Sequence, residues 1–251
     1  MTEAMSAEFD TIAVWTAQAA IELGPSFRIP AACRGSGSPA VLDWLIEQLD
    51  LTAGETFLDC GAGVGGPAAY AARHRSVHPV LVDPEGGACQ AARDLFGYPV
   101  VQASASALPL SDESFDAAWA LGVLCTMPDQ LPLLTELRRV IRPSGRIGLL
   151  VFMARSSEPF EQPDGNHFPT EDVLMSLVDE AGLVIQEWRG TEEFAPAPQR
   201  WQGHVDAVSA ALLVRHGHEP AWQMAERQSE KIGQLIADSV VTGEVLTLRR
   251  R

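Results

Sequence analysis

The fold of this chain is decided by residues 57–66, which read FLDCGAGVGG. The first apolar residues predict a short buried strand, and Asp59 lies where that strand reaches the edge of its sheet. Gly61 and Gly63 permit positive φ and carry no Cβ, so a ligand can approach the backbone closely. A helix expected over Gly66–His74 points its positive N-terminus at the same place. This order of strand, glycine turn and helix predicts a site for a small cofactor.

A second apolar run, His78–Asp83, ends on a carboxylate 22 positions after Gly61. A strand–helix–strand unit places an acid at this spacing against the hydroxyls of a ribose. A carboxylate that accepts from two hydroxyls makes charge-assisted hydrogen bonds, about twice as strong as neutral ones. Gly61, Gly63 and Gly66 also satisfy the GxGxxG pattern of dinucleotide sites. These features allow either a nicotinamide or an adenosine cofactor.

Three further segments separate these alternatives. Residues 100–110, VVQASASALPL, predict a third strand that runs into a turn, and residues 115–121 predict a fourth strand. Residues 136–148, ELRRVIRPSGRIG, predict the end of a helix and a turn into a fifth strand over Arg146–Met153.

With these motifs in this order, the chain resembles the class I S-adenosylmethionine-dependent methyltransferases, especially the branch that acts on small molecules. The family's pattern is D-x-G-x-G-x-G, then an acid, then LPxxxxSFD, then LRRVLRPGG, which this chain has as LRRVIRPSG, and the resemblance covers residues 41–189. It implies an α/β fold with a Rossmann-like, seven-stranded, mostly parallel sheet flanked by helices. It also implies S-adenosylmethionine as the cofactor.

The resemblance further implies roles for individual residues. Asp59 and the glycine turn would face the methionine end of the cofactor, Asp83 would hold the ribose hydroxyls, and Pro84 would pack on adenine. The family usually places an acid beside adenine in the turn after the third strand, where this chain has Ser104. A hydroxyl can accept from the adenine amine, without charge assistance. The full set expected against the cofactor is Asp59, Gly61, Ala62, Gly63, Asp83, Pro84, Ser104, Ala105 and Leu121.

Length and composition predict one globular domain. Of the 251 residues, 46% are hydrophobic and 20% are charged, which is ordinary for an α/β domain with a sizeable core. No run of about 18 apolar residues occurs, so no membrane span is expected. The acidic N-terminus lacks the apolar core of a signal peptide, which favours the cytoplasm.

The net charge of −15 argues against a nucleic-acid partner, because an acidic surface repels the phosphate backbone. The four cysteines form no CxxC pair, so neither a disulfide framework nor a structural metal site is expected. The expected partner is a small-molecule acceptor, and the expected state is a monomer or a homodimer.

The chain is expected to divide into an N-terminal cap (1–39), a cofactor-binding core (40–190), a helical insertion (191–243) and a last strand (244–251). The cap should hold a helix over Ala7–Leu23 and a loop over Pro25–Pro39. Arg28 and Arg34 in this loop are candidates for the carboxylate of the cofactor, or else solvated loop arginines.

Beyond the fifth strand, residues 156–169 form a long loop of the kind that often serves as a lid or a binding loop. A helix over Glu171–Ala181 and a strand over Val184–Trp188 should follow. Two helices, 201–215 and 220–240, precede the last strand, expected over Glu244–Leu248. We expect this insertion to line the substrate chamber rather than to mediate dimerisation.

Methyl transfer from a sulfonium is an in-line displacement, so a base is needed only when the nucleophile arrives protonated. His167 is the candidate, since its loop follows the fifth strand at the carboxyl edge of the sheet. Its alternative role is to stabilise the turn before Thr170. Cys125 and Thr126, after the fourth strand, are candidates for lining the acceptor site, and His204 in the insertion is a weaker one.

Besides a non-catalytic binding protein, three functions therefore remain open at this point. The first is methyl transfer to a small, apolar metabolite at oxygen, nitrogen or carbon. The second is another reaction in the same cofactor pocket, such as a cyclisation, because a fold does not fix its chemistry. The third is a nicotinamide-dependent oxidoreductase, which GxGxxG and Asp83 permit but the LRRVIRPSG turn and the late helices fit poorly.

Overall fold

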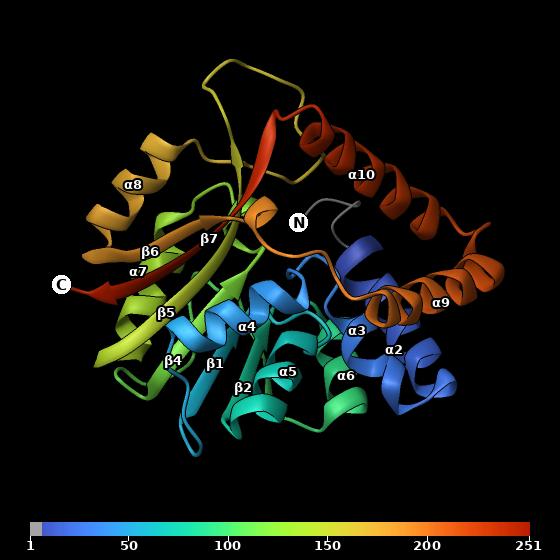
Figure 1. Ribbon diagram of the computed structural model, residues 1–251, viewed down its shortest axis with the longest axis horizontal. Coiled ribbons are helices and arrows are strands. Elements are labelled where there is room, and N and C mark those ends of the chain that lie inside the picture. The colour runs from blue at the N-terminus through green and yellow to red at the C-terminus, as the bar shows by residue number, and fades with distance from the viewer. Residues whose placement is uncertain (1–6) are drawn as a thin grey trace.

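A computed structural model describes residues 7–251, which form a seven-stranded sheet between two layers of helices (Figure 1). The strand order is β3-β2-β1-β4-β5-β7-β6. The strands are β1 (Thr56–Cys60), β2 (His78–Asp83), β3 (Val100–Gln102), β4 (Phe115–Leu121), β5 (Ile141–Ala154), β6 (Leu183–Gly190) and β7 (Val241–Arg250). Strands β1 to β5 pair in parallel, and β7 runs antiparallel between β5 and β6. The expected mostly parallel, Rossmann-like sheet is confirmed.

The helices of the core follow the strands in the order that a parallel sheet requires. They are α4 (Pro39–Gln48), α5 (Gly66–Arg75), α6 (Gly86–Phe96), α7 (Leu131–Val140) and α8 (Glu171–Glu180), with a short turn of helix, η2 (Leu124–Thr126), after β4. Two of them begin where the sequence supplies a cap. The hydroxyl of Ser38 accepts from the Val41 N–H at the start of α4, and Thr170 accepts from the Val173 N–H at the start of α8.

Alternate residues of the central strands supply two separate cores. Leu58 and Cys60 of β1 pack on the face that α7 and α8 cover. Phe57 and Trp119 pack on the opposite face, against α4 and α5, with their ring centroids 4.6 Å apart. Asp59 shares the parity of Phe57 along β1 and therefore lies on the α4–α5 face.

A third layer of helices forms at one end of the sheet. It contains η1 (Ala7–Thr11), α2 (Ile12–Leu23) and α3 (Pro25–Ala32) from the N-terminal segment, and α9 (Gln199–His216) and α10 (Pro220–Ala237) from the segment between β6 and β7. Figure 1 shows α9 and α10 beside α2 and α3 although some 180 residues separate them in the chain. One buried apolar cluster joins them, with Ile12, Ala20, Val208, Leu212 and Trp222 among its members.

The structure differs from the sequence expectation in this layer. Residues 25–32 form the helix α3, where a loop was expected over Pro25–Pro39. Gly24, with φ at 115°, ends α2, and Pro25 occupies the first turn of α3, where a missing N–H costs nothing. Packing of Ala31 and Ala32 then stabilises a sequence whose local signals indicate turns. The loop proper covers only residues 33–38.

The last two strands are longer than expected. Strand β6 covers Leu183–Gly190 and β7 covers Val241–Arg250, and each pairs with the other over most of its length. The pairing of Arg155 N–H with the Val240 carbonyl continues this end of the sheet toward the loop over residues 156–169. No helix within residues 7–251 is long and apolar enough to cross a membrane.

Candidate active site

The glycine turn after β1 is held in place by its own backbone. The N–H groups of Gly61 and Ala62 both donate to the Val82 carbonyl, at 2.7 and 3.0 Å. Gly61 has φ at 73°, and a Cβ there would lie 2.3 Å from a methyl carbon of Val123. Position 61 therefore has to be glycine. In this conformation the N–H groups of Gly61 and Ala62 therefore already have an acceptor within the protein.

Asp59 is buried beneath the first turn of α5 and carries an incomplete set of partners. Its Oδ2 accepts no well-formed hydrogen bond from the described residues. Burial raises the pKa of Asp59 to about 7, the nearby Trp119 indole and Ala68 N–H oppose this rise, and Asp83 adds to it. A buried carboxylate oxygen without a partner is costly. The arrangement suits a cationic group that would supply the missing hydrogen bond.

Asp83 lies at the end of β2 with both carboxylate oxygens engaged. Its Oδ2 accepts from the Gly63 N–H at 2.7 Å and its Oδ1 from the Glu85 N–H at 3.0 Å. Burial raises the pKa of Asp83, and these two N–H donors oppose the rise. Each oxygen keeps a further lone pair for a hydroxyl. Asp83 thus joins the glycine turn to the start of α6 and remains able to accept from a ligand.

The turns after β2 and β3 lie beside this carboxylate. Pro84 and Ser104 are both exposed, while Ala105 is buried. The Ala103 N–H donates to the Asp83 carbonyl at 3.0 Å, which brings the β3 turn against the end of β2. The Ser104 hydroxyl lies 2.8 Å from that of Ser106. Leu121 is buried at the end of β4. The residues expected against the cofactor therefore end four adjacent parallel strands at one edge of the sheet.

The N-terminal helices reach this edge too. The end of α3 packs so closely on α5 that a Cβ at Gly66 would lie 2.4 Å from the Ala32 carbonyl. Arg28 was expected as a candidate to bind the carboxylate of the cofactor. Its guanidinium instead donates to the Leu95 carbonyl of α6 at 3.3 Å. Arg34 is exposed in the loop over residues 33–38. The loop passes over β4, where the Gly35 carbonyl would lie 2.9 Å from a Cβ at Gly122.

The candidate residues for acceptor chemistry come together in two groups. Cys125 and His167 are linked by a backbone hydrogen bond of 2.7 Å from the His167 N–H to the Cys125 carbonyl. The His167 side chain is exposed, whereas Cys125 is buried and burial raises its thiol pKa to about 11. The Thr126 hydroxyl donates to the Val123 carbonyl. His204 lies elsewhere, with its ring 4.6 Å from that of Phe27 on α3.

The long loop after β5 lies against the insertion. Phe168 belongs to a small apolar cluster with Cys125, Ala154 and Val241, and Phe160 and Leu235 pack on its border. Lys231 of α10 pairs with Glu161 of the loop at 2.5 Å. Figure 1 shows this loop above the junction of α10 and β7. The loop, η2 and α10 thus border the same region beyond β4 and β5.

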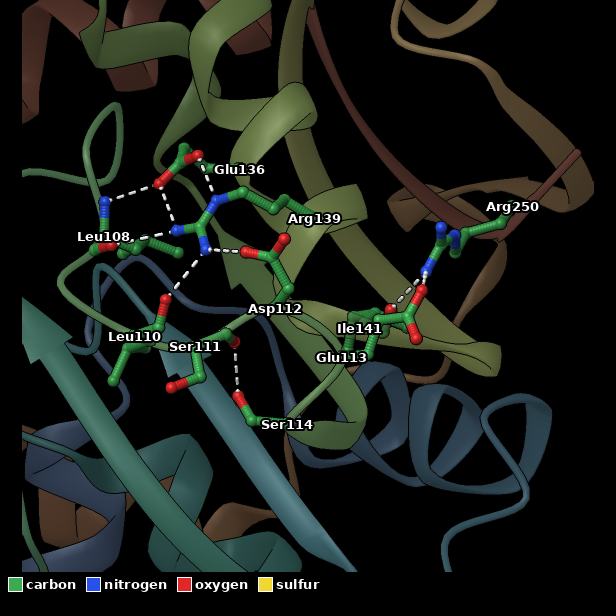
Figure 2. A network of polar contacts seen from close by, with 10 residues as sticks. All are labelled: Leu108, Leu110, Ser111, Asp112, Glu113, Ser114, Glu136, Arg139, Ile141 and Arg250. Atoms are coloured by element: carbon green, nitrogen blue, oxygen red, sulfur yellow. Dashed lines mark hydrogen bonds and ion pairs between the residues drawn. The ribbon is translucent and has the colours of Figure 1, made fainter.

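A polar clamp fixes the turn after β3 (Figure 2). Arg139 of α7 binds both oxygens of Glu136, the carbonyls of Leu108 and Leu110, and the carboxylate of Asp112. Glu136 in turn accepts from the Leu108 N–H at 2.7 Å. Two of the sequence motifs, LPLSDESFD and ELRRV, are therefore two halves of one contact. The clamp holds the segment that carries Ser104 and Ala105.

Two residues of this region escaped the sequence analysis. Asp10 of η1 accepts from the Gly87 N–H at the start of α6, and Gln130 donates to the carbonyls of both Leu124 and His167. Both make contacts with distant parts of the chain, and neither lies in a recognisable motif. Glu85, between Asp83 and Gly87, is also buried, and burial raises its pKa.

Comparisons with known proteins agree with this geometry. A family described as "Methyltransferase domain" matches residues 58–149. The methyltransferase GfsG of Streptomyces halstedii is 34% identical over 120 residues, which cover 45% of this chain and 43% of that protein. The 27-O-demethylrifamycin SV methyltransferase of Amycolatopsis mediterranei is 34% identical over 122 residues, 44% of this chain and 43% of that protein. The chain thus spans less than half the length of these two relatives.

Among solved structures, the crystal structure of the cyclase SpnF is similar over 84% of this chain and 79% of that one, with a TM-score of 0.66 and 24% identity. This likeness shows that the two proteins share a fold.

Proposed function

We propose that this chain, whose residues 58–149 match a methyltransferase-domain family, is a class I S-adenosylmethionine-dependent methyltransferase and transfers a methyl group from S-adenosylmethionine to a small-molecule acceptor. The observation that carries this proposal is the buried Asp59 carboxylate with its unpartnered Oδ2, next to Asp83 at the carboxyl edge of the sheet. An amino group suits the first carboxylate, and a ribose diol suits the second. S-adenosylmethionine carries both groups, an ammonium group at its methionine end and a diol on its ribose.

The residues present fit this cofactor. Asp59 would accept from its ammonium group, and Asp83 would accept from its ribose hydroxyls with the lone pairs that Gly63 and Glu85 leave free. Pro84 would pack on adenine, Ser104 would accept from the adenine amine, and Ala62, Ala105 and Leu121 would supply apolar contacts. When bound, the sulfonium supplies an electrophilic methyl group and a neutral leaving group.

The protein's own contribution would be alignment and exclusion of water. Cys125 and Thr126 on η2 would line the acceptor site, and the loop over residues 156–169 and α10 would close it. The apolar cluster around Phe168 favours an acceptor with an apolar body. His167 would take the proton of an acceptor hydroxyl or ammonium group before the methyl group moves.

The direct test is incubation with methyl-labelled S-adenosylmethionine and a metabolite extract, following both label transfer and release of S-adenosylhomocysteine. We expect label in a small molecule and an equal amount of S-adenosylhomocysteine. Binding of the cofactor without either product would favour another reaction in the same pocket, such as a cyclisation. Tight binding of NADH instead would favour an oxidoreductase.

Calorimetric titration tests the cofactor site itself. Asp83→Ala should weaken S-adenosylmethionine binding by about 2–3 kcal/mol, the range for hydrogen bonds to a charged group. Asp94→Ala is the matched control, since Asp94 is an exposed acid of α6 whose partner is Gln90. Equal affinity in a folded Asp83→Ala variant would remove Asp83 from the site.

The proposal extends to the setting of the enzyme. The net charge of −15 favours a metabolite over a nucleic acid as acceptor. Sedimentation of the purified protein would decide between a monomer and a homodimer.

A further inference from the structure

Gln130 is a buried polar residue that lies between the segments following β4 and β5. It is 8% exposed and immediately precedes α7. Its side-chain Nε2 donates to the Leu124 carbonyl at 3.1 Å and to the His167 carbonyl at 2.7 Å. The N–H of His167 donates to the Cys125 carbonyl at 2.7 Å. The backbone of His167 is therefore held at both its N–H and its carbonyl.

The chemistry of these contacts requires an amide. An uncharged carboxamide has two N–H donors on one nitrogen, and here two carbonyl oxygens accept from that nitrogen. A carboxylate of the same shape would turn an oxygen toward both carbonyls, and an apolar side chain would leave both without this donor. Because Gln130 is buried, water cannot replace the lost bonds easily.

The position of these bonds matters for an acceptor. Cys125 lies on η2, and His167 lies in the loop over residues 156–169, so Gln130 fixes one proposed wall of the acceptor site relative to the other. Other contacts of this loop, such as the ion pair of Glu161 with Lys231 and the stacking of Phe160 on Phe168, do not involve the backbone of His167. Gln130 joins η2 directly to the residue that is the candidate base.

We infer that Gln130 is a positioning residue for methyl transfer, whose carboxamide sets the place of His167 relative to Cys125 and thereby aligns the acceptor with the methyl group. The inference rests on the proposed function. It predicts that loss of the two donors loosens the loop and slows transfer without affecting the cofactor site, since the residues proposed to bind S-adenosylmethionine lie on other turns.

Three variants of Gln130 separate its donors from its volume. Gln130→Met keeps a long side chain and removes both donors. Gln130→Asn keeps the amide, but its side chain is one methylene shorter and cannot span both carbonyls. Gln130→Glu removes the donors when ionised and regains one when protonated. Gln186→Glu on β6 is the matched control, since Gln186 is exposed and bonds only its own neighbour, the Ile185 carbonyl.

The first readout is hydrogen exchange of the amides in residues 160–169, expressed as protection relative to the unstructured chain. We expect protection to fall about 5- to 100-fold in Gln130→Met at every pH. In Gln130→Glu it should fall at pH 8 and recover toward the wild type at pH 5, when the carboxylic acid can donate. Cys125 does not add a pH effect of its own, because burial raises the pKa of its thiol to about 11 and the thiol stays protonated over this range. His167 is present in every variant, so any effect of its titration appears in all of them.

The second readout is transfer of label from methyl-labelled S-adenosylmethionine to the extract fraction that the wild type methylates. Misplacement by about 1 Å can cost 10²-fold, so we expect kcat/KM to fall about 10- to 100-fold in Gln130→Met. The dissociation constant of S-adenosylmethionine should stay within about twofold of the wild type, and Gln186→Glu should match the wild type in every measurement.

The outcomes distinguish this inference from the proposed function. Unchanged protection of residues 160–169 in the Met and Asn variants, or a pH-independent Glu variant, would overturn the role of Gln130. Loosened exchange with unchanged kcat/KM would also overturn it, since the contact would then be structural only. A wild type that binds S-adenosylmethionine and labels no acceptor would instead overturn the proposed function. If the Glu variant does not fold, the Met and Asn variants decide the question alone.

Discussion

The Asp10 carboxylate accepts a hydrogen bond of 2.5 Å from the Gly87 N–H, and this contact attaches the N-terminal helices to the start of α6. The two residues are 77 positions apart. Gly87 allows the approach, because a Cβ there would lie 2.6 Å from the Asp10 carbonyl oxygen. Gly87 is four residues from Asp83, so the N-terminal helices are anchored beside the carboxylate proposed to bind ribose.

We expect Asp10→Ala to loosen the N-terminal helices, because the Gly87 N–H at the helix N-terminus loses its acceptor. The free energy of unfolding should fall by about 1 kcal/mol, as it does when other helix caps are removed. Hydrogen exchange in residues 9–23 should become faster. Asp10→Asn keeps an acceptor oxygen and should stay close to the wild type. Equal exchange in the Ala and Asn variants would mean that the contact does not anchor the helices.

Gly87→Ala tests the same contact from its other side. Alanine favours a helix over glycine by about 1 kcal/mol, so α6 alone should gain stability. The new methyl group would nevertheless displace Asp10, and exchange in residues 9–23 should rise. Gly233→Ala in α10, where a Cβ meets nothing within 4 Å, provides the control for helix propensity.

Asp59 should make stability fall as the pH rises. Its pKa is raised from 3.8 to about 7 in the folded protein, so the folded state binds the proton more tightly than the unfolded state. Asp59 therefore hardly affects the free energy of unfolding below about pH 4, where it is protonated in both states. Above pH 7 its ionised carboxylate lowers the free energy of unfolding by about 4 kcal/mol. Asp59→Asn should accordingly raise the free energy of unfolding at pH 8, by about 1–3 kcal/mol after the penalty of its own unpaired amide. Urea denaturation at pH 8 and near pH 4 measures this, and a gain of equal size at both values would contradict the buried charge.

Arg139 should hold the turn after β3. Arg139→Met would remove the donors to the Leu108 and Leu110 carbonyls and should lower the free energy of unfolding by about 1–3 kcal/mol. Arg138→Met is the neighbouring control, since Arg138 makes one bond of 3.3 Å to the Gly182 carbonyl. The hydrogen bond from Arg139 lowers the pKa of Glu136, so this part of the stability is present above pH 4.5 and is lost as the pH falls through the lowered value. The Met variant should lose less stability on acidification than the wild type does.

Ser104→Asp should tighten binding of S-adenosylmethionine, because a carboxylate accepts from the adenine amine with charge assistance. Ser104 is exposed and already accepts from the Ser106 N–H at 3.3 Å, a bond that aspartate can keep. Ser106→Asp adds the same charge two residues away and should not tighten binding. Weaker binding to a folded Ser104→Asp variant would show that position 104 does not face adenine.

His167→Ala should lower turnover about 10²- to 10⁴-fold if His167 takes a proton during transfer. The affinity for S-adenosylmethionine should change little, and the loss should be smaller for acceptors that arrive deprotonated. The backbone bonds of His167 to Cys125 and Gln130 remain in this variant, so the loop should keep its place. Full activity would make His167 a structural loop residue and would indicate a reaction driven by alignment alone.

The parts of the fold that sequence reasoning predicts are those with local signals. The β1 strand, the glycine turn and α5 follow one another within 20 residues, and the near-continuous apolar runs of β4 and β5 indicate buried parallel strands. Helix α3 was missed because proline, glycine and serine dominate its surroundings, and packing on α5 and α9 decides its conformation.

In the candidate site, too, residues with a local sequence signal could be predicted and residues that act through distant contacts could not. Asp59 and Asp83 end apolar runs, so their places at the sheet edge follow from the strands. Asp10 and Gln130 act through backbone groups 77 and 37 positions away, and no periodicity or motif encodes such pairs. The hydrogen bonds from the Gly61 and Ala62 N–H groups to the Val82 carbonyl could not be predicted either, because that carbonyl belongs to another strand.

The antiparallel pairing of β6 with β7 places Gly190 opposite Glu244, so the chain leaves the sheet for α9 and returns from α10 at almost the same point. An insertion with such closely spaced attachment points can be exchanged or lengthened without altering the strand order. An exchanged insertion would have to pack on the N-terminal helices, because the two segments share the buried cluster that contains Ile12, Ala20, Val208 and Trp222. A chimaera that transplants residues 199–237 from a relative has to bring that relative's first helices with it. If the insertion lines the acceptor site as proposed, two distant stretches of sequence then determine acceptor preference together.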